Sequence, residues 1–283
     1  MIIDTEEFSK FANSLADDAS KTSMHYFRNK IEIEIKDDES PLTLADKETE
    51  EVLRERIRKE YPDHGILGEE YENEKIDAEF IWVLDPIDGT RSYIAGHKDF
   101  GNLIALIHNK KPVLGIINCP AHNERWMGIK NQKTKCNGKD VQTSAIKQIK
   151  DAYLFTSGLY FDEPQIRKGL ELLKEKSRYY RLGGDCYMYG MLASGLIDIV
   201  LEDTLKVHDY MALVNVIEGA GGVITDKFGQ DISLDSDGSL VASSTSFLHD
   251  EIIKLISLKE VFEVSEKIVN SQFSGRAVVD LSK

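Results

Sequence analysis

The sequence has few cysteines, and they form no recognisable motif. The three of them, Cys119, Cys136 and Cys186, are widely spaced and include no C-x-x-C pair. This pattern argues against a disulfide framework and against a zinc ribbon. Isolated cysteines of this kind fit a reducing compartment, and we therefore expect a cytoplasmic protein.

Positive charge and long apolar runs are also scarce. The chain has 35 Lys and Arg residues against 49 Asp and Glu residues, a formal net charge of −14. Because nucleic-acid binding needs clustered Lys and Arg, we expect no nucleic-acid partner. No run approaches the roughly 18 apolar residues of a membrane span, and no signal peptide is visible, so we expect no membrane partner either. If such an acidic chain handles phosphate, the positive charge must come from elsewhere, and a divalent metal is the simplest source.

Several familiar catalytic motifs are missing. None of the seven histidines belongs to an H-E-x-x-H motif, and there is no G-x-S-x-G elbow or Walker A loop. The segment Gly219-Ala220-Gly221-Gly222 is only weakly similar to a dinucleotide-binding fingerprint. It follows a predicted helix, so we interpret it as a glycine stop. We interpret His208 as a local hydrogen-bonding residue, not as a zinc ligand.

At 283 residues the chain has room for two domains, which we place at residues 1–145 and 146–283. The first is predicted to be α+β. Asp4 and Glu7 form a capping-box pattern before a helix, and a second helix is predicted over Ala45–Glu60. Short β-rich runs separated by turns then indicate an antiparallel meander, with strands at Ile81–Leu84, Leu103–Ile107, Val113–Ile117 and Arg125–Ile129.

The second half alternates between strand and helix patterns, which indicates an α/β layer. The predicted strands are Ala152–Thr156, Arg178–Leu182, Ile197–Leu201, Val223–Thr225 and Leu240–Ala242. The predicted helices are Pro164–Lys176, Cys186–Ser194, Tyr210–Gly219 and a final one near His249–Ile256.

The most informative segment is Asp85-Pro86-Ile87-Asp88-Gly89-Thr90, which follows an apolar strand. Pro86 fixes φ and Gly89 permits a sharp turn, so the two carboxylates and the Ile87 carbonyl can converge. Mg²⁺ prefers such oxygen ligands. Thr90 and the N–H groups of Gly89 and Thr90 could face a phosphate. The alternative is an ordinary surface turn, the commoner context of Asp-Pro and Asp-Gly.

Four other acids are candidates for the same site. Glu69 belongs to a Gly-Glu-Glu segment that could equally be a solvated acidic pair. Asp46, Asp185 and Asp209 each stand at the start of a predicted helix, where simple capping of the helix is the competing interpretation.

In their order along the chain, these segments resemble the inositol monophosphatase superfamily, and the resemblance covers nearly the whole sequence. It carries Asp46, Gly68-Glu69-Glu70, Asp85–Thr90, Gly183-Gly184-Asp185 and Asp209 followed by Glu218–Gly222. The resemblance implies a five-layered αβαβα sandwich and a homodimer. It also implies two to three Mg²⁺ ions held by Glu69, Asp85, the Ile87 carbonyl, Asp88 and Asp209. Thr90, with Asp46 and Glu69, is then expected to orient and activate the attacking water.

Within this superfamily, the stretches Asp85–Gly115 and Gly184–Leu213 resemble the histidinol-phosphate phosphatase branch, which acts in histidine biosynthesis. We therefore expect the substrate to be a small phosphorylated metabolite, most simply L-histidinol phosphate. Asp185 and Glu202 are expected to face its amino group, and the substrate-binding residues are expected to be Gly89, Thr90, Gly184, Asp185 and Glu202. His208 and Asn215 depart from the pattern of that branch. Inositol 1-phosphate and 3′-phosphoadenosine 5′-phosphate are the alternative substrates, and a non-catalytic phosphate-binding relative is the alternative outside enzymes. The resemblance also implies sensitivity to Li⁺.

Overall fold

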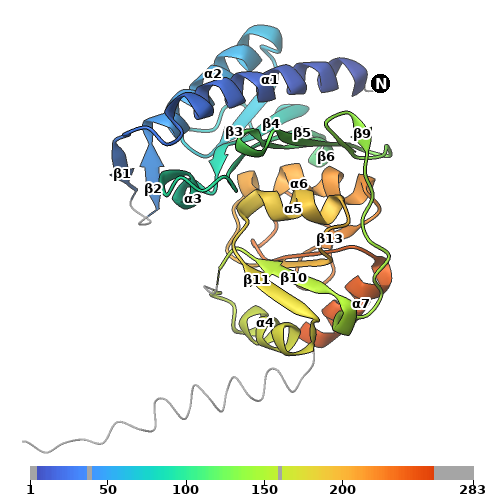
Figure 1. The fold of residues 1–283 in the computed structure, drawn as a ribbon. Coiled ribbons are helices and arrows are strands. Elements are labelled where there is room, and N and C mark those ends of the chain that lie inside the picture. The colour runs from blue at the N-terminus through green and yellow to red at the C-terminus, as the bar shows by residue number, and fades with distance from the viewer. Residues whose placement is uncertain (1–4, 37–39, 159–160, 258–283) are drawn as a thin grey trace, which may run out of the picture.

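The computed structural model describes residues 5–36, 40–158 and 161–257, and it has five layers (Figure 1). Two helices cover a seven-stranded sheet, two further helices lie between that sheet and a five-stranded one, and a last pair covers the far face. The expected αβαβα sandwich is confirmed. The expected capping box at Asp4 and Glu7 depends on Asp4, which lies outside the described residues.

The first layer consists of α1 (Thr5–Tyr26) and α2 (Leu44–Glu60). Apolar side chains from both helices form one core with one face of the seven-stranded sheet, among them Leu15, Leu53 and Trp82. Their burial follows the helical spacing of apolar residues seen in the sequence. The layer places the start of α2, and with it Asp46, against the sheet.

The seven-stranded sheet forms the second layer. Most of the sheet is a meander, because each strand from β4 to β9 runs antiparallel to the next one. Strand β3, in contrast, runs parallel to β4. In the order of the sheet the strands are β3 (Gly65–Gly68), β4 (Phe80–Asp88), β5 (Gly101–His108), β6 (Lys111–Cys119), β7 (Glu124–Ile129), β8 (Lys135–Cys136) and β9 (Lys139–Asp140). The predicted meander is confirmed, while β3, β8 and β9 were not predicted from the sequence.

The middle layer consists of α5 (Asp185–Ala193) and α6 (Val207–Gly219). Helix α6 lies very close to the seven-stranded sheet because Gly115 and Gly128 face it. A side chain at either position would overlap the main chain of Ala212 or Asn215. This close approach brings the first turn of α6, which carries Asp209, to the end of β4.

The five-stranded sheet has the order β11, β10, β12, β14, β13. Its strands are β10 (Tyr153–Thr156), β11 (Tyr179–Leu182), β12 (Ile199–Glu202), β13 (Val223–Thr225) and β14 (Leu240–Ser243). The pairs of β10 with β11 and β12 are parallel, and β14 runs antiparallel to β12 and β13. Helices α4 (Pro164–Lys176) and α7 (Ser246–Ile256) cover its outer face. The predicted alternation of strand and helix is therefore confirmed.

Short elements complete the fold near the site. Strands β1 (Ile33–Ile35) and β2 (Pro41–Thr43) form an antiparallel pair, and α3 (Thr90–Ile94) follows β4 directly. Two single 3₁₀ turns span Pro120–His122 and Ile149–Asp151. The expected division at residue 145 falls between the two sheets in the sequence, and that the two halves are separate domains stays a prediction.

Candidate metal centre

The end of β4 differs from the expected turn. The strand continues through the motif to Asp88, and its pairing with β5 shifts on the way: Asp85 lies opposite Leu103, and Asp88 lies opposite Gly101. Three steps along β4 thus match two along β5, which is a bulge. In a regular strand, residues three apart point to opposite faces. The extra residue cancels that alternation, so both carboxylates reach the same side of the sheet.

The sharp turn expected at Gly89 lies immediately after the strand. Gly89 has a φ of 81°, in the left-handed region that glycine adopts without strain, and α3 begins at the next residue. Asn102 supports the bulge from the neighbouring strand, since its side-chain amide donates to the Pro86 carbonyl at 2.6 Å. The sequence thus located the turn at Gly89 correctly, but it ended the strand at Leu84, four residues too early.

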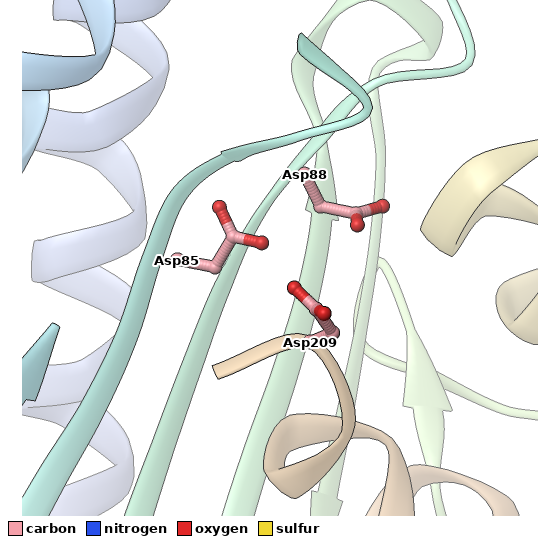
Figure 2. Close-up of side chains that lie close together, drawn as sticks. All are labelled: Asp85, Asp88 and Asp209. Carbon is pink, nitrogen blue, oxygen red and sulfur yellow. The ribbon is translucent and has the colours of Figure 1, made fainter. Parts of the chain in front are cut away.

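Asp209 joins these two aspartates from the first turn of α6. Figure 2 shows the three carboxylates directed toward one another, two from β4 and one from the helix. Asp85, Asp88 and Asp209 each offer an oxygen atom, and these oxygens lie within 4.8 Å of one another. We call these residues the three-aspartate cluster. Burial and the neighbouring negative charges raise the pKa of both Asp85 and Asp88 well above the usual value.

Each member of the cluster also has a structural hydrogen bond to a main-chain amide. Asp209 accepts one from Lys206 N at 2.7 Å, Asp88 accepts one from Cys186 N at 2.6 Å, and Asp85 accepts one from Ile87 N at 3.0 Å. Capping and the functional interpretation are therefore compatible, because a carboxylate has two oxygens. Asp209 is the third residue of α6 and not its N-cap.

Asp46, in the first turn of α2, also combines a capping role with a contact to another predicted site residue. One oxygen accepts hydrogen bonds from the Thr43 amide and hydroxyl as part of a capping box, while the other lies 3.5 Å from the Thr90 hydroxyl. That hydroxyl also donates to the Ile87 carbonyl at 3.1 Å. Burial raises the pKa of Asp46 to about 6. The structure thus brings together three predicted site residues beside the cluster.

Glu69 has a partner that the sequence did not reveal. Its carboxylate forms an ion pair with Lys36 Nζ at 2.8 Å, and Glu70 binds the same ammonium group. Glu69 is not one of the three residues whose oxygens converge. Its charge nevertheless raises the pKa of Asp85, after burial the largest cause. Lys36 lies among acidic residues in the sequence, so nothing there distinguishes it from a solvated lysine.

A small cavity of about 70 Å³ opens beside the cluster. Asp88, Asp185, Glu202 and Asp209 all line it. Glu202 is buried and accepts hydrogen bonds from Tyr189 Oη at 2.7 Å and from Ser157 N at 3.2 Å, and burial raises its pKa to about 7. The two acids that were expected near the leaving group therefore line the same cavity as two cluster aspartates.

Asp185 makes a contact that was not expected from its position at a helix start. It does not cap α5; its carboxylate instead accepts a hydrogen bond from the Ser92 hydroxyl at 2.5 Å and packs against Gly89. Burial raises its pKa. Gly184, the N-cap of α5, lines a separate neighbouring cavity of about 380 Å³ together with Ser92. The structure thus places Asp185 in the lining of the cavity beside the cluster, whereas Gly184 lines the neighbouring cavity.

The donor set suits a hard divalent cation. Three buried or half-buried carboxylates at mutual distances of up to 4.8 Å repel one another by about 3 kcal/mol per charged pair at an effective dielectric of 20. Mg²⁺ prefers carboxylate oxygens and removes that repulsion.

None of the helices in the described ranges has both the length and the apolar character that a membrane crossing requires.

Comparison with known proteins agrees with this chemistry. The model of the inositol monophosphatase family matches residues 4–260. The chloroplastic bifunctional phosphatase IMPL2 of Arabidopsis thaliana is 42% identical over 245 residues, 85% of this chain and 71% of that protein. A histidinol-phosphatase of Chlorobaculum parvum is 32% identical over 237 residues, which cover 83% of this chain and 92% of that one. A solved structure of an inositol monophosphatase from Zymomonas mobilis superposes with a TM-score of 0.83 at 38% identity, covering 91% of this chain and all of that chain.

Proposed function

Since the chain belongs to the inositol monophosphatase family and is a phosphatase of that family, we propose that it is a magnesium-dependent phosphomonoesterase with L-histidinol phosphate as its preferred substrate. The three-aspartate cluster is the single observation that carries the metal dependence. Glu69 and the Ile87 carbonyl complete the proposed ligand set for two to three ions. When bound, the metal ions neutralise the phosphate and stabilise the departing alkoxide.

The residues around the cluster suit the handling of a water molecule. Thr90 at the start of α3 and Asp46 at the start of α2 lie in hydrogen-bond contact, so a water beside them has both a donor and an acceptor. A pKa of about 6 leaves Asp46 mostly ionised at neutral pH yet still basic enough to accept a proton. We assign Thr90 and Asp46, with Glu69 next to them, to orienting and deprotonating the attacking water.

The acids beyond the cluster support an amine-bearing leaving group. Asp185 and Glu202 line the small cavity with Asp88 and Asp209, and each has a raised pKa. An ammonium group compensates buried carboxylates, whereas a neutral polyol offers only hydroxyl hydrogen bonds, about half as strong. Histidinol phosphate carries that ammonium group. Relatives named histidinol-phosphatase include those of Chlorobaculum parvum and Mycobacterium tuberculosis.

Inositol 1-phosphate is the second candidate, because the Zymomonas mobilis structure with 38% identity is that of an inositol monophosphatase. 3′-Phosphoadenosine 5′-phosphate is the other alternative substrate. A non-catalytic role is disfavoured because every proposed ligand position, and Thr90, carries a competent residue. The homodimer and the cytoplasmic location stay predictions. The exposed side chains of Tyr179 and Tyr180 on the edge strand β11 favour the former.

A substrate comparison tests the proposal. We expect a higher kcat/KM for histidinol phosphate than for inositol 1-phosphate in the same Mg²⁺ buffer. Asp185→Asn keeps the shape of the side chain and an acceptor for Ser92, and asparagine also tolerates the left-handed backbone at this position. It should reduce the preference by about 1–3 kcal/mol, the value of a hydrogen bond to a charged group.

Ser92→Ala is the matched control, because it removes the contact with Asp185 and leaves the charge. It should keep the preference for the amine substrate. If wild type prefers inositol 1-phosphate, or if Asp185→Asn affects both substrates equally, recognition of the amine by Asp185 is wrong.

A further inference from the structure

Helix α2 presents a row of buried charged residues toward the site. Asp46, Glu50 and Arg54 follow one another at intervals of four residues, and all three side chains are fully buried. Residues four apart lie on the same face of a helix. A buried charge is strongly unfavourable unless it is paired and hydrogen-bonded. The partners of Glu50 and Arg54 therefore show what this face of the helix is for.

Glu50 connects the helix to the chain just beyond Glu69. One of its oxygens accepts a hydrogen bond from Arg54 Nε at 2.7 Å, and the other accepts one from the main-chain amide of Glu70 at 2.8 Å. Gly68 lies against the same carboxylate so closely that a side chain there would overlap it. Glu69 is thus enclosed between two residues that both contact Glu50.

Arg54 holds the rest of the same turn. Its guanidinium donates to the carbonyl oxygens of Tyr71 at 3.1 Å and Glu72 at 3.0 Å, and to the carboxylate of Glu74 at 2.9 Å. We call residues 69–74 the Glu69 turn. Within the described part of the chain, main-chain hydrogen bonds close this turn only where Glu74 pairs with Ile66. The polar groups in between are therefore held mainly by the two side chains of α2.

The position of Glu69 depends on this arrangement. Glu69 directly follows β3, whose last residue, Gly68, pairs with Leu84 of β4, next to Asp85, so the path of the turn sets the distance of Glu69 from the three-aspartate cluster. The direct partner of Glu69, Lys36, lies on a different segment and binds Glu70 equally well, so Lys36 alone does not fix the turn. Replacing a buried ion pair by apolar residues is often neutral or stabilising. Stability alone is thus a poor reason for burying Glu50 and Arg54.

We propose that Glu50 and Arg54 are positioning residues that fix the Glu69 turn on α2, so that Glu69 is held at the distance and direction that metal binding needs. This inference rests on the proposed function, since it assigns the pair a role at the same metal site. The same helix then contributes Asp46 to the chemistry at its first turn, and at its next two turns it sets the position of a metal ligand from another segment.

Arg54→Lys tests the proposal with little change in charge. Lysine keeps the positive charge beside Glu50, but its single ammonium group cannot reach all the acceptors that the guanidinium fork binds. Glu50→Gln is the second variant, because glutamine still accepts from Glu70 N but loses the charge that orients Arg54. Arg58→Lys is the matched control. Arg58 lies on the same helix and binds Glu74 and Glu51, and none of its hydrogen bonds in the described structure goes to the main chain of the turn.

Metal affinity should be measured directly, with electron paramagnetic resonance to monitor Mn²⁺ binding to the substrate-free enzyme. A second measure is the Mg²⁺ concentration that gives half of the maximal activity. Mutation of a residue that orients a metal ligand typically weakens metal affinity by 10–100-fold. We expect Arg54→Lys and Glu50→Gln to weaken Mn²⁺ binding by about tenfold or more. Arg58→Lys should stay close to wild type. At saturating Mg²⁺ the KM for the phosphate ester should change little.

A double mutant separates positioning from general damage. If Arg54 acts through Glu69, then Arg54→Lys should weaken Mn²⁺ binding no further once Glu69→Gln is present, because coupled residues are not additive. Full additivity would overturn the proposal, as would Mn²⁺ affinities of both variants equal to that of Arg58→Lys. A wild-type enzyme without Mg²⁺-dependent phosphatase activity, in which Arg54→Lys still weakens Mn²⁺ binding, would contradict the proposed function but not the positioning role.

Discussion

Replacing Asp209 with asparagine removes one charge from the three-aspartate cluster and keeps its shape. Asparagine retains an oxygen for the hydrogen bond from Lys206 N, so α6 keeps its first-turn contact. The substitution eliminates two of the three repulsive pairs, each about 3 kcal/mol at full charge. Because burial, with neighbouring carboxylates as a further cause, raises the pKa of all three aspartates, partial protonation already relieves much of this repulsion.

We therefore expect the metal-free variant to be more stable than metal-free wild type, by about 1–2 kcal/mol at pH 8. For a chain of this size that is roughly 2–3 °C in Tm. Mg²⁺ should reverse the order, since a ligand that binds only the folded state stabilises it in proportion to its affinity. Millimolar Mg²⁺ should thus raise the Tm of wild type and leave the variant almost unchanged, and the variant should lose most of its kcat.

Differential scanning calorimetry with EDTA and with Mg²⁺ measures both effects. Asp226→Asn is the matched control, because Asp226 also accepts main-chain hydrogen bonds, from Phe228 and Gln230, and is not a member of the cluster. It should not gain stability in EDTA. If Asp209→Asn lowers the metal-free Tm, or if Mg²⁺ stabilises it as much as wild type, the account of the cluster as a metal site is refuted.

Two further predictions concern pH and lithium. The pKa of Glu202 is about 7 in the folded protein against 4.5 ordinarily, so the folded state binds the proton more tightly and the free energy of unfolding falls as pH rises from about 4.5 to about 7. For metal-free protein the contribution of Glu202 to this loss is about 3 kcal/mol; Glu202→Gln should remove that contribution in urea titrations at pH 5 and pH 8, and an unchanged pH dependence would show that Glu202 makes no such contribution. From the family resemblance we also predict that millimolar Li⁺ inhibits phosphate release, and complete indifference to Li⁺ would count against an inositol-type site.

The sequence patterns predicted most of the longer elements, and the family resemblance named the three aspartates that meet at the cluster. The apolar run Ile81–Leu84 was correctly predicted to be a strand. In the structure Ile81 and Val83 pack into one core, and Trp82 and Leu84 pack into another. The exact geometry of Asp85 and Asp88 was not predictable. It depends on the bulge opposite β5, which is a property of strand pairing and leaves no signal in β4 alone.

Residues that act through distant partners were also hidden. Glu50 and Arg54 have the spacing of an ordinary solvated helix pair, and only the Glu69 turn, about 20 residues further along, makes them buried. Asp185 was expected to face the substrate, which stays a prediction; its hydrogen bond from Ser92, which joins α5 to α3, was not predicted. Such contacts follow from the packing of layers, which local patterns do not encode.

The most direct test of the central claim is phosphate release from histidinol phosphate by purified wild-type protein, first in excess EDTA and then after Mg²⁺ is restored. A site built on Asp85, Asp88 and Asp209 predicts no release in EDTA and full recovery at millimolar Mg²⁺. Undiminished release in excess EDTA would contradict the claim.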